Sequence, residues 1–341
     1  MKVLLAGNRG YLGSSLQDLL QQDGHEVVGL DIGFFDPAPV QPRQDIRDVG
    51  EVDVDRCDAV VNLAAMCNDA CGDLSESVTH EINSAANARL ARMARALGAR
   101  VYVFASSCSV YGTAAGADML DENDPVAPET AYAVSKVQAE RETLRLRTES
   151  FAPVALRFAT LFGDSPSFRS DILVNRIGGT AARWGAVQVN GTGELWRPLL
   201  HVRDAARAIA FVLNADPAAV SGEVFNVGFP DQNHQIIDVV NMARDLVPEL
   251  SVSHVPAVDG RSYVVCFDKF LNSFGGFAPT CSVADGMREV VAAYQGKLRL
   301  RMRAARDGWA DTDRREFLLA MRAGGQLDDE FRWNVDSLVV S

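Results

Sequence analysis

The sequence has no paired cysteines, no long apolar runs and no excess of positive charge. Its six cysteines show no C-x-x-C spacing, so we expect reduced thiols and predict neither a disulfide framework nor a metal site. No apolar run approaches the ~18 residues of a membrane-spanning helix. The start, MKVLLAGNRG, has too short an apolar run for a signal peptide, so we expect a cytoplasmic protein. The formal net charge of -12 argues against nucleic acid or an anionic membrane as a partner.

Short apolar runs alternate with amphipathic stretches through the first half of the chain. The runs KVLLAG, HEVVGLD, DAVVNLAA, RVYVFASS and PVALRFA are typical of buried parallel strands. Helical patterns lie between them, the longest at about 75–97 and 128–149. This alternation predicts an α/β fold, a Rossmann-type doubly wound parallel sheet. We place this domain at 1–160, with returning segments around 196–228.

Three glycines separate the first expected strand from the first expected helix. Gly7 permits the tight turn, Gly10 lets the backbone approach a pyrophosphate, and Gly13 lets the helix pack on the strand. The helix N-terminus then offers free N–H groups to the phosphates. Asp31 ends the second expected strand, near the usual distance of ~20 residues, where a carboxylate bonds ribose hydroxyls and repels a 2′-phosphate. The pattern therefore predicts NAD in preference to NADP.

The segment RQDIRD follows the second expected strand. Asp45 and Ile46 are placed there to flank the adenine of the dinucleotide. For Asp48, two residues later, an N-cap of a short helix is an equally ordinary explanation.

Tyr132 and Lys136, in YAVSK, form a candidate proton-transfer pair. Their spacing of four puts both side chains on one helical face, where a neighbouring ammonium is expected to lower the pKa of the tyrosine. Only four of the 33 basic residues are lysines, which makes a chance pairing rare, although a surface pair on an amphipathic helix remains the alternative. Ser107, in SSCSVYG at the end of a core strand, can bond the same substrate oxygen. Hydride transfer involving nicotinamide needs such a proton relay.

The order of G-x-x-G-x-x-G, Asp31, NLAA, SSCSVYG and YAVSK resembles the extended short-chain dehydrogenase/reductase family, in its nucleotide-sugar epimerase/dehydratase branch, over roughly residues 1–295. The resemblance implies Ser107, Tyr132 and Lys136 as the catalytic triad. It also implies Asn83 as a residue of the cofactor-site framework, although an asparagine inside a helix could simply bond the backbone. The other cofactor-binding residues that it implies are Arg9, Tyr11, Leu12, Leu63, Ala64, Ala65 and Phe158, together with Tyr132 and Lys136.

The second half of the chain is expected to bind the substrate. We place a smaller α/β substrate-binding lobe mainly at 161–295 and a C-terminal helical extension at 296–341. The amphipathic stretch REFLLAMRAGG of that extension would pack on the substrate lobe or on a partner subunit.

Two arginines are candidates for holding a diphosphate. WRPLLHVRDAARAI resembles the family motif R-D-[FY]-x-H-V-x-D and implies that Arg197 contacts the substrate diphosphate, whereas His201 and Asp204 start a helix. The alternative is that Arg197 forms a salt bridge with Asp204. Arg261, in GRSYVVCFDKF, is implied as a second phosphate-binding arginine. The other candidate substrate-binding residues are Ser107, Cys108, Thr160 and Asn175, the last of which could instead be a helix cap.

The resemblance implies an NAD-dependent epimerase that acts on a nucleoside-diphosphate sugar through a transient keto sugar, with a homodimer as the expected assembly. A 4-ketoreductase or dehydrogenase uses the same triad and is the alternative. A dehydratase is disfavoured, because Ser107, Cys108 and Ser109 stand where that branch carries Thr-Asp-Glu. A non-catalytic NAD-sensing protein is disfavoured because it would be expected to have lost the tyrosine or the lysine.

Overall fold

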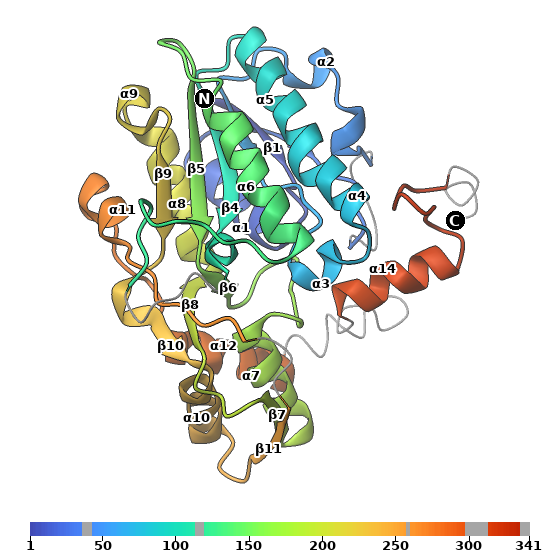
Figure 1. Ribbon diagram of the computed structural model, residues 1–341, viewed down its shortest axis with the longest axis vertical. Helices are drawn as coiled ribbons and strands as arrows, with labels where there is room; N and C mark the ends of the chain where they lie inside the picture. Colours follow the sequence, from blue (N-terminus) through green and yellow to red (C-terminus); the bar gives the residue numbers. More distant parts are fainter. Residues whose placement is uncertain (36–42, 113–118, 257–259, 297–312, 335–341) are drawn as a thin grey trace.

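A parallel sheet of six strands forms the centre of the molecule (Figure 1). The computed structural model describes residues 1–35, 43–112, 119–256, 260–296 and 313–334. The strands lie in the order β2 (Glu26–Leu30), β1 (Lys2–Ala6), β3 (Ala59–Asn62), β4 (Val101–Ser107), β5 (Ala152–Phe158) and β9 (Val224–Val227). Chain order reverses between β1 and β3, and ligands of such sheets bind beyond the carboxyl ends of the strands at that point.

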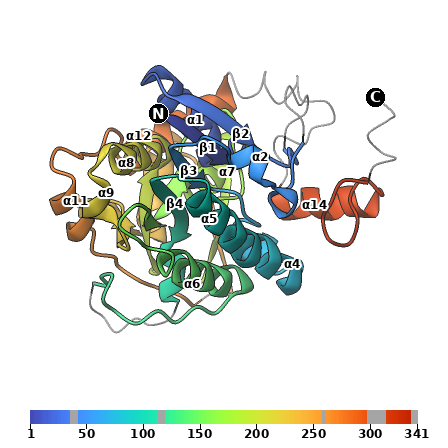
Figure 2. The same cartoon turned by 90° about the horizontal axis from the view of Figure 1, so that it is seen from above.

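Helices cover both faces of this sheet, as Figure 2 shows, which confirms the doubly wound fold. Alternate residues of β1 pack on opposite faces of the sheet. Val3 and Leu5 pack in one apolar cluster with Leu16, whereas Leu4 packs in another with Leu90. The helices that contribute to the first cluster include α1 (Tyr11–Gln22) and α8 (Val202–Asn214), and those that contribute to the second include α2 (Glu51–Val54) and α5 (Asn87–Ala96).

The two longest expected helices differ in detail from their predicted form. The stretch expected at about 75–97 is a series of α4 (Glu76–His80), a π-helical turn (Glu81–Ala86) and α5. The helix expected at 128–149 is the shorter α6 (Ala131–Leu144). The Oγ1 atom of Thr130 accepts the N–H of Ala133 at 3.1 Å and fixes the start of α6.

A smaller lobe lies below the sheet in the view of Figure 1. It contains a three-stranded sheet in the order β10 (Asn233–Gln235), β8 (Trp196–His201), β6 (Thr160–Phe162), and the parallel pair β11 (Ser251–Val255) and β7 (Ala186–Asn190). Its apolar cluster is separate from those of the main sheet. The helices around that cluster are α7 (Leu173–Trp184), α10 (Ile236–Leu246) and α12 (Val283–Gln295). The remaining short helices include α3 (Asp69–Gly72), α9 (Pro217–Val220) and α11 (Asp268–Ser273).

The C-terminal helix α14 (Arg314–Ala323) lies beside α3, against the main sheet domain (Figure 1). Phe317 and Leu318 are buried in the apolar cluster that contains Leu4. The extension was expected to pack on the substrate lobe or on a partner subunit, but the apolar face of α14 packs on the nucleotide-binding domain of its own chain. Within the described residues, no helix combines the length and the apolar character needed to span a bilayer.

Candidate active site

A cavity of about 550 Å³ opens beyond the carboxyl ends of the sheet strands. It brings together the predicted glycine loop, catalytic residues and arginines, which come from both the main domain and the lobe. Two predicted residues, Asn83 and Asn175, do not line it. The predicted residues that do are Gly7, Arg9, Gly10, Tyr11, Leu12, Gly13, Asp31, Asp45, Ile46, Leu63, Ala64, Ala65, Ser107, Cys108, Tyr132, Lys136, Phe158, Thr160, Arg197 and Arg261.

The glycine loop has the shape that a dinucleotide requires. Gly7 has φ +83°, and a Cβ there would lie 2.8 Å from the backbone nitrogen of Ala64. A Cβ on Gly13 would collide with the carbonyl of Gly7. Gly10 precedes α1 without a side-chain cap, and the first turn of α1 contains no acidic residue. The N-terminal N–H groups of α1 are therefore not capped by a side chain, and the residues fit a bound pyrophosphate.

Asp31 follows β2 and faces this loop. Its Oδ2 accepts the backbone N–H of Arg9 at 3.0 Å, and its Oδ1 accepts the N–H of Gly33 at 2.7 Å. The guanidinium of Arg9 donates to the carbonyl of Asp31 at 2.8 Å, so an arginine lies next to the carboxylate that is expected to bind the ribose. This geometry fits the ribose of the cofactor.

Residues Ile46–Asp48 form a short 3₁₀ helix. Asp45, and not Asp48, is its N-cap, because Asp45 Oδ1 accepts the N–H of Arg47 at 2.8 Å. Asp48 instead pairs with Arg332 at 2.6 Å. Asp45 and Ile46 both line the cavity, where the adenine was expected.

The three predicted catalytic residues lie at one wall of the cavity. Ser107 ends β4, and its Oγ accepts the N–H of Ser109 at 3.2 Å. Lys136 Nζ donates to the carbonyl of Ala105 at 2.7 Å and lies 5.5 Å from the ring centre of Tyr132. Ser107 lies close enough to Tyr132 to lower the pKa of the tyrosine. The tyrosine therefore lies near both a hydroxyl group and an ammonium group.

The pKa values of this pair correct one prediction. Burial raises the pKa of Tyr132, and the nearby Cys67 and Asp69 raise it further, against the lowering effect of Ser107 and Arg169. Burial lowers the pKa of Lys136 to about 8. The expectation that the ammonium lowers the tyrosine pKa is wrong, because desolvation of the phenolate is the largest influence on that pKa.

Asn83 supports the cavity without lining it. Its side chain accepts the N–H of Met66 at 2.8 Å and donates to Ser135 at 3.0 Å. It thus ties the loop after β3 to α6. Asn83 therefore supports the framework of the site, as expected, but it does not line the cavity as a cofactor-binding residue would.

The two arginines predicted to hold a diphosphate both line the cavity. Arg197 donates to the carbonyls of Trp196 and Arg261 and lies 5.7 Å from the ring centre of Tyr263. Arg261 pairs with Asp69 at 2.9 Å. Arg197 does not bridge to Asp204, which pairs instead with Arg207 at 2.7 Å. The salt bridge to Asp204, which was the alternative for Arg197, is therefore wrong.

Asn175 is not a substrate-binding residue in this structure. Its side chain is fully buried and bonds the backbone of Gly163 and Arg169. It also does not cap α7, which is preceded by Ile172. His201 is buried, pairs with Glu289 at 2.8 Å and starts α8, as expected of a structural residue.

Thr160 and Cys108 occupy the cavity wall as predicted. The thiol of Cys108 is directed to the carbonyl of Arg157 at 3.3 Å, and burial raises its pKa.

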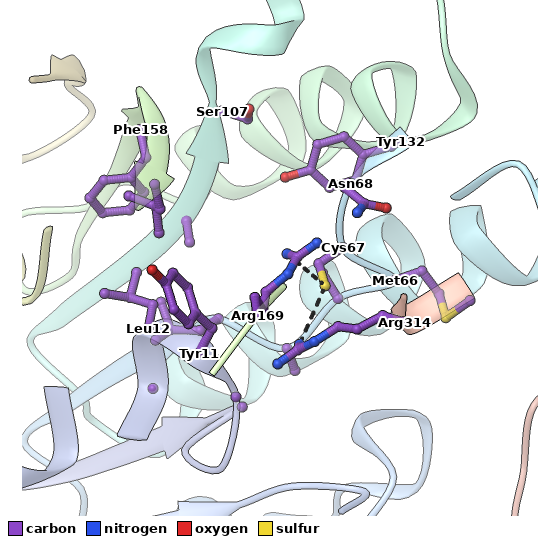
Figure 3. A pocket seen from close by; sticks show the side chains of 18 of the residues that line it. Tyr11, Leu12, Met66, Cys67, Asn68, Ser107, Tyr132, Phe158, Arg169 and Arg314 are labelled. Carbon is purple, nitrogen blue, oxygen red and sulfur yellow. Dashed lines mark hydrogen bonds between the residues drawn. The ribbon is translucent and has the colours of Figure 1, made fainter. Parts of the chain in front are cut away.

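Sequence reasoning missed a cationic cluster in the same cavity, shown in Figure 3. Arg169 and Arg314 both donate to the sulfur of Cys67, at 3.4 and 3.8 Å. Arg169 also pairs with Asp171 at 2.5 Å. The position of Cys67 just after the strand that ends in NLAA could have marked it as a site residue. No sequence signal connects Arg314 to a residue 247 positions away.

Comparison with known proteins identifies the family to which this chain belongs. The model of the NAD dependent epimerase/dehydratase family matches residues 3–228. A Bacillus subtilis (strain 168) protein named as the uncharacterized UDP-glucose epimerase YtcB is 27% identical over 278 residues, 74% of this chain and 84% of that protein. The UDP-glucose 4-epimerase of Mycolicibacterium smegmatis is 30% identical over 250 residues, 67% of this chain and 77% of that enzyme.

A solved structure resembles this chain over a larger share of its length, which includes the smaller lobe. MoeE5, in complex with UDP-glucuronic acid and NAD, has a TM-score of 0.76 at 25% identity and covers 87% of this chain and 100% of that one. The family match spans the glycine loop, the Ser-Tyr-Lys residues and every strand of the main sheet. The chain therefore belongs to the NAD dependent epimerase/dehydratase family of extended short-chain dehydrogenases/reductases, and its cofactor is NAD.

Proposed function

We propose that the protein is an NAD-dependent epimerase of a nucleoside-diphosphate sugar. The observation that carries this proposal is the single cavity in which Tyr132, Lys136 and Ser107 lie between the glycine loop and the pair Arg197 and Arg261. A sugar joined to a diphosphate has the length and charge to reach from the arginines to the tyrosine. The Bacillus subtilis and Mycolicibacterium smegmatis relatives are both named as epimerases of UDP-glucose, and MoeE5 was solved with UDP-glucuronic acid, which supports the same substrate class.

The chain's own residues supply the proton chemistry. As a phenolate, which the positive charges of Lys136 and of bound NAD would favour against burial, Tyr132 Oη would accept the proton of the sugar hydroxyl, and Ser107 Oγ would hydrogen-bond the same oxygen. Lys136, with a pKa of about 8, is protonated at neutral pH and supplies a positive charge next to the phenolate. Bound NAD supplies the position that accepts the hydride and returns it. Because bound NAD would give the same hydride back, Tyr132 Oη would need only to return the proton to the sugar oxygen, and the epimerisation would involve no net oxidation.

The chemistry at the end of β4 favours epimerisation over elimination of water. Elimination needs an acid and a base beside the sugar. Of the residues at this position, Cys108 has a raised pKa and bonds the backbone, and Ser107 and Ser109 are hydroxyls. None is a carboxylate that could carry the protons.

The proposal is tested by a two-stage experiment. The melting temperature of the protein with NAD is first measured against a panel of nucleoside diphosphates, one of which is expected to raise it. Sugars linked to that nucleotide are then incubated with the protein without added reductant, and the products are separated. An epimer supports the proposal. A product that forms only when NADH or NADPH is supplied would assign a ketoreductase instead, and no stabilisation by any nucleoside diphosphate would contradict the substrate class.

A further inference from the structure

The C-terminal helix places one charged side chain inside the cofactor cavity. Arg314 is the first residue of α14, is only 7% exposed and lines the cavity. Arg169, 8% exposed, lies beside it, and both guanidinium groups contact Cys67. Figure 3 shows the two side chains converging on the sulfur from different directions.

In this buried cluster two guanidinium groups meet one carboxylate and one thiol. Asp171 pairs with Arg169, and among the described residues Arg314 forms no ion pair with a carboxylate. Burial raises the pKa of Cys67, but the two arginines outweigh that effect and lower it overall. Both guanidinium groups line the cavity, and each carries five N–H donors, so the cluster is suited to an anionic ligand.

The cluster is tied to the phosphate-binding end of α1. Tyr11, the first residue of α1, donates from its hydroxyl to the carbonyl of Gly163 at 2.7 Å. Ser165, in the same loop, donates to the carbonyl of Tyr11 at 2.6 Å. The loop then continues to Arg169, and Arg314 donates to Ser167 at 3.4 Å. The loop therefore brings both arginines to the end of the cavity where α1 begins.

The rest of the C-terminal segment is fixed to the adenosine side of the cavity. Arg314 lies 4.2 Å from the ring centre of Phe35, which packs on Phe317 with ring centres 5.1 Å apart. Trp333 Nε1 donates to the carbonyl of Ile32, next to Asp31, at 2.8 Å. These contacts hold the start of α14 in place over the cavity.

We propose that Arg314, together with Arg169, binds the diphosphate of NAD, so that the C-terminal helix completes the cofactor site. The helix N-terminus of α1 and the two guanidinium groups then contact the diphosphate from different sides. Departure of the cofactor requires these contacts to break, which slows its release. This inference rests on the cofactor of the family and not on the sugar substrate, so its failure leaves the epimerase proposal untouched.

The test compares Arg314→Gln with Arg315→Gln, a control at the exposed neighbouring position of the same helix. Affinities are measured by calorimetry for NAD, ADP-ribose, adenosine and UDP, and the release rate of NAD is followed by fluorescence. Loss of a charge-assisted hydrogen bond predicts that Arg314→Gln binds NAD and ADP-ribose about 10- to 150-fold more weakly. Release of NAD becomes faster in proportion. Adenosine and UDP bind unchanged, and Arg315→Gln behaves as wild type.

Three results would overturn the proposal. NAD affinity within threefold of wild type in Arg314→Gln removes the residue from the cofactor site. If Arg314→Gln binds UDP more weakly than wild type but binds NAD equally well, Arg314 contacts the substrate and not the cofactor. If Arg314→Gln loses affinity equally for adenosine and for ADP-ribose, the substitution disturbs the fold and does not remove a diphosphate contact. Arg314→Lys, which keeps the charge, is expected to recover part of the NAD affinity.

Discussion

Replacement of Lys136 by methionine is expected to abolish most of the activity and yet not to destabilise the cofactor-free protein. Lys136 is only 3% exposed, and burial lowers its pKa from 10.5 to about 8. That difference corresponds to roughly 3 kcal/mol of unfavourable free energy at neutral pH, where the buried amine is charged. Methionine has a similar length and no charge, so it relieves this cost.

The substitution also removes a favourable contact. Lys136 Nζ donates to the carbonyl of Ala105, and leaving that oxygen without its donor costs about 1–3 kcal/mol. The balance predicts a Lys136→Met protein that is about 0–2 kcal/mol more stable than wild type at pH 7. A surface lysine with a normal pKa would give no such gain.

The pH dependence of the unfolding free energy tests the cost of burying the charged lysine independently. Between the folded pKa of about 8 and the unfolded value of 10.5, the unfolded wild-type chain binds one more proton than the folded chain at this residue. The wild type therefore gains about 1.4 kcal/mol of unfolding free energy per pH unit relative to the variant over that window. Urea unfolding of both NAD-free proteins from pH 7 to 10 measures the difference. A variant that is less stable than wild type by more than ~1 kcal/mol at pH 7, with a difference that does not change with pH, would refute the reasoning.

The remaining predictions concern single side chains of the cavity. Tyr132→Phe should keep NAD affinity but lower turnover by roughly 10²–10⁴-fold in a steady-state assay; activity within threefold of wild type removes Tyr132 from the mechanism. Asp31→Ala should raise the affinity for NADP relative to NAD by about tenfold or more, because one repulsive charge contact of at least ~1.4 kcal/mol is lost; an unchanged ratio in a titration speaks against the assignment. Arg197→Ala should weaken nucleoside-diphosphate binding by about 10- to 150-fold without changing NAD affinity, whereas Arg207→Ala, the structural control, should lower only the melting temperature. Iodoacetamide should alkylate Cys67 more slowly when NAD is bound; equal rates with and without NAD would place the thiol away from the cofactor.

The sequence was sufficient for those parts of the site that depend on local spacing. Gly7, Gly10 and Gly13 lie between a strand and a helix, and Tyr132 and Lys136 lie one helical turn apart. Strand ends of a parallel sheet meet at one edge, so Asp31 and Ser107 were expected to reach the same cavity, and both line it.

Other features depend on tertiary packing and could not be predicted. Arg314 reaches Cys67 only because the apolar face of α14 packs on the main domain. Asn175 was taken for a ligand because its polar side chain lies near a helix start, but the fold uses its amide to hold the loop at Gly163. The pKa of Tyr132 depends on burial, which residue spacing does not reveal.

The most direct test of the proposed reaction follows the hydrogen at the carbon that is oxidised. The purified protein with its own NAD, and no added cofactor, is incubated with a nucleotide sugar that carries deuterium at that carbon; UDP-glucose and UDP-glucuronic acid labelled at C4 are the first probes. The account predicts that the epimer forms and retains its deuterium, because the hydride leaves and returns within one closed cavity while Tyr132 moves only the hydroxyl proton. An epimer that has exchanged its deuterium for solvent hydrogen, or a reaction that requires one equivalent of added NADH, would contradict it.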